Sequence, residues 1–91
     1  MSNMDSARIV AELSDANPEA VFFDGMDSAL IGVGRIAHLD PLPVYSKARM
    51  YLQLFADGLS RFEAEECFMS KFVGLWAGDK TPIILDDMPE D

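Results

Sequence analysis

The chain contains one histidine, His38, and one cysteine, Cys67. An imidazole beside a thiol can take the thiol proton, so this pair is one that nucleophilic catalysis uses. However, His38 lies in a proline-bounded loop, and Cys67 falls beside the apolar face of an expected helix, where a thiol behaves as a small hydrophobe. One histidine and one cysteine do not complete a zinc site without carboxylates or a second chain. We therefore expect no catalytic residue, metal or other cofactor, and a small enzyme that uses His38 is kept as an alternative.

The stretch DGMDSALIGVGR, residues 24–35, places glycines and acids around a short apolar run. Gly32 and Gly34 fit a loose dinucleotide-binding pattern, but the prolines that follow prevent the helix such a site needs. Asp24 and Asp27 lack the alternating acids and late glutamate of a calcium loop. The stretch is better explained as an Asp-Gly turn that leads into a strand, whose glycines mark a close approach by a packed helix, an aromatic ring or a ligand.

Acidic residues outnumber basic residues by sixteen to seven, which gives a net charge of -9. The bases are scattered and form no stripe that could neutralise a phosphate backbone, so we expect no direct binding of nucleic acid. The charge favours a protein partner with a basic surface, and a merely solubilising role is the alternative. The candidate interaction residues combine acids expected at the surface with the single tryptophan: Asp57, Glu65, Glu66, Trp76, Asp86 and Asp87. Trp76 has two interpretations, a lid on the core and an interface anchor.

The expected location is the cytoplasm. The first residues show no basic segment followed by an apolar core, so they do not form a signal peptide. The apolar stretches are far shorter than the roughly 20 residues that a membrane helix needs. A single cysteine cannot form a disulfide within the chain, so nothing indicates an oxidising compartment.

The elements that must position these residues begin with a short helix. Ile9 and Leu13 recur at helical spacing, and Asp5 or Ser6 is the expected cap. Four short apolar runs then predict strands, because they are rich in branched and aromatic residues and bounded by turn residues. These runs are AVFF at residues 20–23, ALIGVGRIA at 29–37, PVYS at 43–46 and PIIL at 82–85.

Between the last two of these strands, the sequence predicts a helical hairpin. Ser46 is the expected N-cap of its first helix, and Gly58 is the expected left-handed residue after that helix. Ser60 and Glu63 have the spacing of a capping box at the start of the second helix. Gly74 is expected to end that helix. Its buried face is expected to comprise Ala64, Phe68, Phe72 and Leu75, with Cys67 beside them.

Together these elements predict a single α+β domain over residues 1–91. We expect a small, mainly antiparallel sheet of three or four strands, covered on one face by the helical hairpin, because this arrangement buries the apolar stripes. The polar ends, residues 1–6 and 86–91, are expected to be mobile.

Two runs, FFDGMDSALIGVG and LPVYSKARMYLQLFADGLSRFEAEECFMSKFVGLWAGDKTPIIL, resemble a group of small uncharacterised bacteriophage proteins. The pattern is an Asp-Gly turn, an ALIG strand, a PV-Y strand, a helical pair with EEAEE-F and a closing G-W-G--TP. It covers residues 22–85, and Phe62 stands where a glutamate often does. The resemblance implies a phage or prophage origin and a role inside an infected bacterium. It brings no activity, so no catalytic residue carries over.

The sequence thus favours a small acidic accessory protein that acts by binding a protein, in its sharpest form an inhibitor of a host nucleic-acid-binding or defence protein. A second hypothesis is a structural or assembly module that forms a homo-oligomer through a sheet edge or the Trp76 region. The small enzyme that uses His38 is the third.

Overall fold

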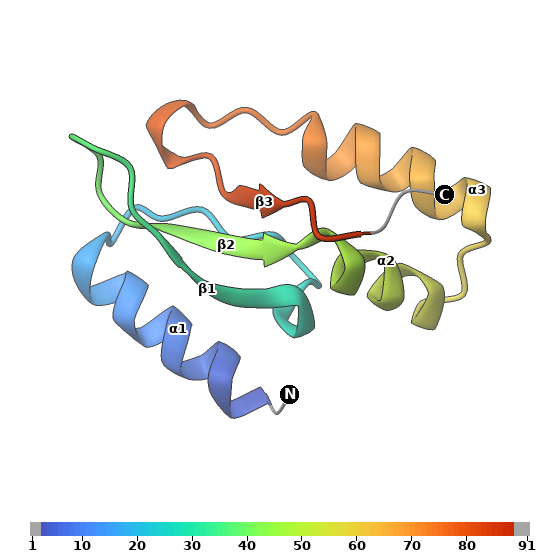
Figure 1. Ribbon diagram of the computed structural model, residues 1–91, viewed down its shortest axis with the longest axis horizontal. Helices are drawn as coiled ribbons and strands as arrows, with labels where there is room; N and C mark the ends of the chain where they lie inside the picture. The colour runs from blue at the N-terminus through green and yellow to red at the C-terminus, as the bar shows by residue number, and fades with distance from the viewer. Residues whose placement is uncertain (1–2, 89–91) are drawn as a thin grey trace.

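The chain folds as an α+β unit in which helices pack against one side and one end of a three-stranded sheet (Figure 1). The computed structural model describes residues 3–88, apart from the side chains of residues 3–5. Its elements occur in the order α1 (Asn3–Ala16), η1 (Asp27–Ala29), β1 (Leu30–Gly34), β2 (Leu42–Ser46), α2 (Lys47–Ala56), α3 (Arg61–Cys67), η2 (Phe68–Val73), η3 (Gly78–Lys80) and β3 (Ile83–Leu85). The α+β prediction is therefore confirmed.

The sheet has the order β1-β2-β3, so β2 is the central strand. β1 pairs with β2 antiparallel, with Val33 opposite Pro43. β3 pairs with β2 parallel and starts only at the partner of Val44, one residue after the proline. A proline is tolerated at this position of a central strand because β3 has not yet begun to pair there.

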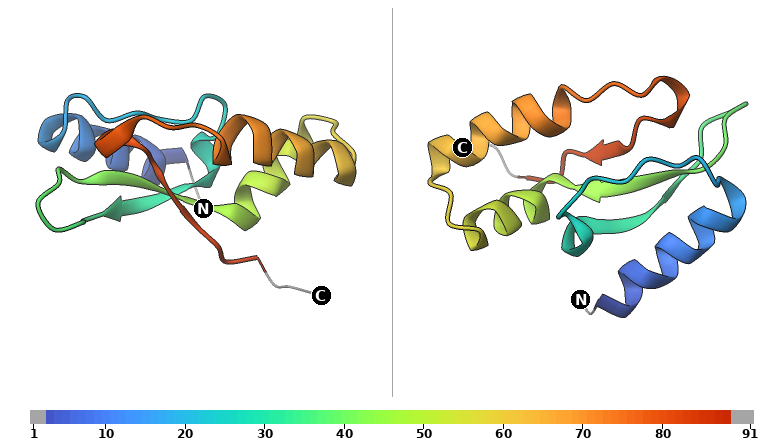
Figure 2. Two further views of the ribbon diagram at one scale, coloured as in Figure 1. Left: turned by 90° about the horizontal axis from the view of Figure 1, so that it is seen from above. Right: turned by 180° about the vertical axis from the view of Figure 1, so that it is seen from behind.

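The described helices leave one side of the sheet uncovered. Seen from above, α1 and α3 lie on the same side of the β1–β2 hairpin (Figure 2). α1 contacts β1 and β2, while α2 follows β2 directly and lies beyond the end of the strands, in contact with η1 and α3 (Figure 1). The predicted hairpin of α2 and α3 exists, but its role as the cover of one sheet face is not confirmed.

The core lies on the side of the sheet that α1 and α3 cover, and it is rich in aromatic rings. Tyr45 of β2 is fully buried, and its ring centroid lies 4.7 Å from that of Phe23. Phe23 in turn contacts Phe72 at 5.0 Å, edge to face. Tyr51 of α2 packs on Phe68 at 5.1 Å, so the two halves of the hairpin share one cluster.

The predicted strand at residues 20–23 is wrong. This segment is extended but pairs with none of the described strands, and the amide of Phe23 donates to the hydroxyl of Tyr45 at 3.0 Å. The β-prone side chains reflect burial, since Phe23 is almost fully enclosed between the sheet and η2. The described residues therefore form three strands.

The first helix is confirmed, but it begins at Asn3 and not at the expected cap. Ser6 lies inside the helix, and its hydroxyl donates to the carbonyl oxygen of Asp27 at 2.6 Å, which ties α1 to η1. The predicted mobility of residues 1–2 and 89–91 falls outside the described residues.

The local signals of the helical hairpin are confirmed. The Ser46 hydroxyl accepts from the amide of Arg49, and Gly58 has φ of 97°. Ser60 and Glu63 form both bonds of the capping box, which lowers the pKa of the Glu63 carboxyl because the bonds favour its ionised form. Gly74 caps η2.

Candidate binding groove

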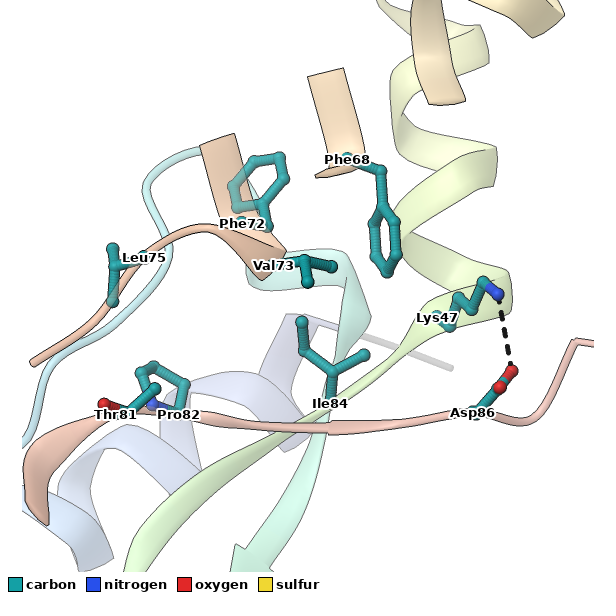
Figure 3. A pocket seen from close by; sticks show the side chains of 9 residues that line it. All are labelled: Lys47, Phe68, Phe72, Val73, Leu75, Thr81, Pro82, Ile84 and Asp86. Atoms are coloured by element: carbon teal, nitrogen blue, oxygen red, sulfur yellow. Dashed lines mark ion pairs between the residues drawn. The ribbon is translucent and has the colours of Figure 1, made fainter. Parts of the chain in front are cut away.

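A groove of about 270 Å³ lies between η2 and β3 (Figure 3). Its walls come from four segments: the start of α2, the α3–η2 helix, the turn that contains Thr81 and the strand β3. The lining is mainly apolar: Phe68, Phe72, Val73, Leu75, Pro82 and Ile84, with Thr81, Lys47 and Asp86 as the polar members. Figure 3 shows Ile84 pointing from β3 toward Val73 across the middle of the groove.

One end of the groove carries a pair of opposite charges. The ammonium of Lys47 lies 3.5 Å from a carboxylate oxygen of Asp86 and 5.6 Å from the centroid of the Phe68 ring. The Lys47 side chain is only 28% exposed, whereas the Asp86 side chain is 68% exposed. The Lys47 side chain is therefore largely enclosed by the Phe68 ring and the groove wall, whereas the Asp86 side chain faces solvent.

The neighbouring acid, Asp87, has a structural role. One of its carboxylate oxygens accepts from the Ser46 hydroxyl at 2.6 Å, and the other accepts from the amide of Ala48 at 3.0 Å. These bonds favour the ionised form and hold the pKa of the Asp87 carboxyl below its usual range. Asp87 thus fastens the end of β3 to the first turn of α2 and keeps Asp86 beside Lys47.

The π-helical turn η2 sets the positions of the groove's upper wall. The amide of Gly74 donates to the carbonyl of Met69 at 3.0 Å, five residues back, which is the hydrogen bond of a π-helix. A Cβ atom on Gly74 would lie 2.9 Å from the carbonyl oxygen of Ser70. The wider turn buries Phe72 and leaves Val73 exposed at the groove.

A second surface runs along the outer side of the α3–η2 helix. Phe62 and Met69 are 70% and 55% exposed, and both Glu65 and Glu66 are exposed between them. The spacing i, i+3, i+4, i+7 puts these four residues on one face, which we call the α3 outer face. The opposite face carries the buried residues of the core.

The predicted interaction residues do not form one site. Glu65 and Glu66 lie on the α3 outer face, whereas Asp86 lies at the groove and Asp87 is bonded to α2. Asp57 ends α2 and accepts a hydrogen bond from the Gln53 amide at 2.9 Å.

The interpretation of Trp76 as a lid on the core is wrong, because this side chain is 82% exposed. It lies just after the end of η2, so its alternative interpretation as an interface anchor stays a prediction.

Sequence reasoning missed two sets of residues. Lys47, Val73 and Ile84 were not predicted to share a groove, because β3 and η2 meet only in the folded chain. Phe62 and Met69 could have been found, since their spacing on a predicted helix places them opposite its apolar face.

The structure does not bring together His38 and Cys67, the pair considered under the enzyme alternative. His38 is exposed in the β1–β2 connection, where it adopts a φ of 70°. That connection and α3, which contains Cys67, lie at opposite ends of the molecule (Figure 1). Among the described residues, no three acids, histidines or cysteines gather to hold a metal ion.

No family model, curated protein or solved structure matches this chain. Within the part of the chain that the structure describes, none of the helices has the length and apolar character to span a membrane.

Proposed function

We propose that this protein is a small non-enzymatic accessory protein that binds a partner protein with a basic surface. The observation that carries the proposal is the α3 outer face, on which two large apolar side chains stand beside two exposed glutamates. Large exposed apolar side chains with a charged rim are typical of protein interfaces. Trp76, which follows η2, is the most exposed of the large apolar residues that the structure describes.

Charge supports the choice of a basic partner. The chain carries a net charge of -9, so its field attracts a basic surface and repels nucleic acid and other acidic proteins. A phage-encoded inhibitor of a host defence or nucleic-acid-binding protein is the specific form that we propose, because proteins that bind nucleic acid expose basic grooves that a carboxylate surface can occupy.

The test is capture of a partner from a bacterial lysate by the tagged protein, followed by a titration of the complex with salt. The double variant Glu65→Lys, Glu66→Lys reverses the charge of the outer face, and Glu12→Lys, an exposed position on α1, is the control. We expect the double variant to lose the partner and the control to keep it. Affinity should also fall as NaCl rises from about 0.1 to about 1 M, over which the Debye length shrinks from about 10 to about 3 Å. A complex insensitive both to salt and to the double variant would contradict the proposal.

A homo-oligomeric assembly module is the second candidate. It is favoured by the uncovered side of the sheet, whose edges β1 and β3 each lack a second neighbouring strand among the described residues. Light scattering at millimolar concentration distinguishes the two candidates: a stable dimer or larger species supports assembly, and a monomer excludes it.

A further inference from the structure

The groove between η2 and β3 is an apolar hollow with a cation at one end. The lining residues carry two charges only, on Lys47 and Asp86, and both lie at the same end (Figure 3). The rest of the described wall offers rings and aliphatic chains, with the Thr81 hydroxyl already bonded to its own turn. Such a site suits a molecule that is apolar along most of its length and charged at one tip.

The size of the groove limits its occupant. Sites for drug-sized ligands measure about 300–1,000 Å³, and this groove measures about 270 Å³. A short hydrocarbon chain or a single ring therefore fits within the groove.

The sign of the charged tip is set by the ion pair. A tight ammonium–carboxylate contact measures about 2.7–2.9 Å, whereas Lys47 and Asp86 are 3.5 Å apart. Lys47 is anchored over the Phe68 ring, and Asp86 faces solvent. An incoming anion can thus replace Asp86 at Lys47, while an incoming cation would meet the fixed ammonium.

Asp87 does not compete for the same position. Both of its carboxylate oxygens are engaged, with the Ser46 hydroxyl and the Ala48 amide. Its bonds keep the end of β3 in place when Asp86 swings away, so the groove keeps its lower wall.

We propose that this groove binds a small amphipathic carboxylate, whose head pairs with Lys47 in place of Asp86 and whose hydrocarbon tail lies between Val73 and Ile84. The class includes medium-chain fatty acids and simple aryl carboxylates. The protein's own Asp86 acts as a weak internal competitor for the ligand head. This binding is independent of the α3 outer face.

The test is a titration of the ¹⁵N-labelled protein with octanoate and octylammonium, each below its critical micelle concentration, and with octanol below its solubility limit in water. The three probes share one hydrocarbon chain and differ only in the head. We expect octanoate to bind at least about tenfold more tightly than the other two, the range of one charge-assisted hydrogen bond. Its chemical-shift changes should centre on the amides of Lys47, Val73 and Ile84.

Two substitutions at the charged end have opposite expected effects. Lys47→Gln removes the cation and should weaken octanoate binding about tenfold, whereas Asp86→Asn removes the internal competitor and should tighten it about threefold. A folding defect could weaken octanoate binding in Lys47→Gln, but it could not produce the gain in affinity expected for Asp86→Asn. The second variant therefore tests the proposal even if the first fails to fold. Lys71→Gln is the matched control. The Lys71 ammonium lies near the Phe72 ring, but Lys71 does not line the groove, so this variant should change octanoate binding less than twofold.

Several outcomes would overturn the proposal. Equal binding of octanol or octylammonium would show that Lys47 does not select the head. Looser or unchanged binding in Asp86→Asn would show that no competition exists. Shift changes centred on the α3 outer face would indicate general adsorption of the chain. Binding of a short peptide with a free C-terminal leucine, but not of octanoate, would assign the groove to a polypeptide end.

Discussion

At the scale of single residues, Gly34 shows why a strand tolerates a glycine. A Cβ atom there would lie 2.6 Å from Cδ1 of Ile83 and 2.9 Å from Cγ2 of Val44. The side chain of Ile83 thus crosses the central strand and rests on β1. A close approach is therefore confirmed at Gly34, but the group is the aliphatic side chain of Ile83 and not a helix, an aromatic ring or a ligand. At Gly32 the prediction is wrong, since such a Cβ would meet nothing within 4 Å beyond its chain neighbours.

Gly34→Ala should therefore destabilise the fold by about 1–3 kcal/mol through overpacking. Gly32→Ala, the matched control on the same strand, should be neutral or stabilising because it reduces the entropy of the unfolded chain. Ile83→Val removes the Cδ1 atom, so the double variant with Gly34→Ala should recover part of the loss. Urea unfolding of the wild type, Gly34→Ala, Ile83→Val and the double variant measures this coupling, and simple additivity would rule out the contact as the cause.

Tyr45 is the residue whose ionisation matters most for the core. Burial raises the pKa of its phenol to about 12, against the hydrogen bond from Phe23 that favours the ionised form. A raised pKa means that the stabilisation is complete below about pH 10, the unfolded value, and is lost as the pH rises toward 12. We expect the free energy of unfolding to fall by about 2 kcal/mol across that interval.

Tyr45→Phe provides the comparison. It should be less stable at neutral pH by about 1–3 kcal/mol, because the Phe23 amide loses its acceptor. Its stability should decline less steeply between about pH 10 and about pH 12. Urea titrations combined with the tyrosinate absorbance measure both effects, and parallel declines in the two proteins would contradict this assignment.

At the scale of elements, the end of β3 is joined to α2 by the hydrogen bonds of one carboxylate and the ion pair of another. Asp87 bonds to the first turn of α2, and Asp86 pairs with Lys47. β3 itself has three residues, Ile83–Leu85, which is too few for strong pairing alone. The two bonds of Asp87 therefore add to the stability of the short ladder, whereas the exposed pair of Asp86 with Lys47 contributes little.

Asp87→Ala should lower the free energy of unfolding by about 0.5–1 kcal/mol at pH 7, the lower range for lost capping bonds because the carboxyl is solvated. The folded pKa is depressed, so this contribution is present above the unfolded value near 3.9 and is lost as the pH falls through the folded pKa. The wild type and the variant should thus converge once the pH has fallen through the folded pKa of Asp87. Urea unfolding at several pH values tests this, with Glu12→Ala as the control. A gap that persists in acid would mean that packing, not the carboxylate, is responsible.

The elements also show how far sequence reasoning reaches. The caps at Ser46 and Ser60 and the left-handed Gly58 were predicted correctly, because each depends on neighbours within a few residues. The π-helical turn and the pairing of β3 were not predicted in these forms, because they depend on contacts between distant segments. The strand prediction at residues 20–23 was wrong for the same reason. Branched and aromatic residues are typical of a paired strand, but they are equally common in a segment that is buried without pairing, as this one is against Tyr45.

In the candidate sites too, the residues placed by local helical spacing could be predicted, and those placed by contacts between distant segments could not. The outer acids Glu65 and Glu66 could be placed from helical spacing, and both are exposed as expected. The groove could not be predicted, since Lys47, Val73 and Ile84 come from three separate elements. The pairing of Asp86 with Lys47 could not be predicted either, because the two residues are far apart in the sequence.

At the scale of the whole molecule, net charge opposes compactness. The chain carries a net charge of -9 within a radius of gyration of 13.1 Å. The Debye length is about 30 Å at 0.01 M salt and about 10 Å at 0.1 M. At the lower concentration every charge acts on every other, so the folded state bears its full self-repulsion.

The melting temperature should therefore rise by several degrees when NaCl increases from about 0.01 to about 0.1 M, since 1 kcal/mol corresponds to about 4–8 °C in a domain of this size. KCl should have the same effect, because screening does not depend on the ion's identity. Differential scanning calorimetry measures the change. A flat or falling curve would mean that local ion pairs, such as the one between Lys80 and Asp40, outweigh the general repulsion.

The parallel pairing of β3 also determines the order of assembly during synthesis. The β1–β2 hairpin closes through a short connection, whereas the bonds that fasten β3 join residues 39 and 41 positions apart. Loop closure over such distances is slow, so β3 is expected to join after the hairpin has formed. On the ribosome, one edge of β2 would thus remain open until residues 83–87 emerge, and a nascent chain is most exposed to mispairing in that interval.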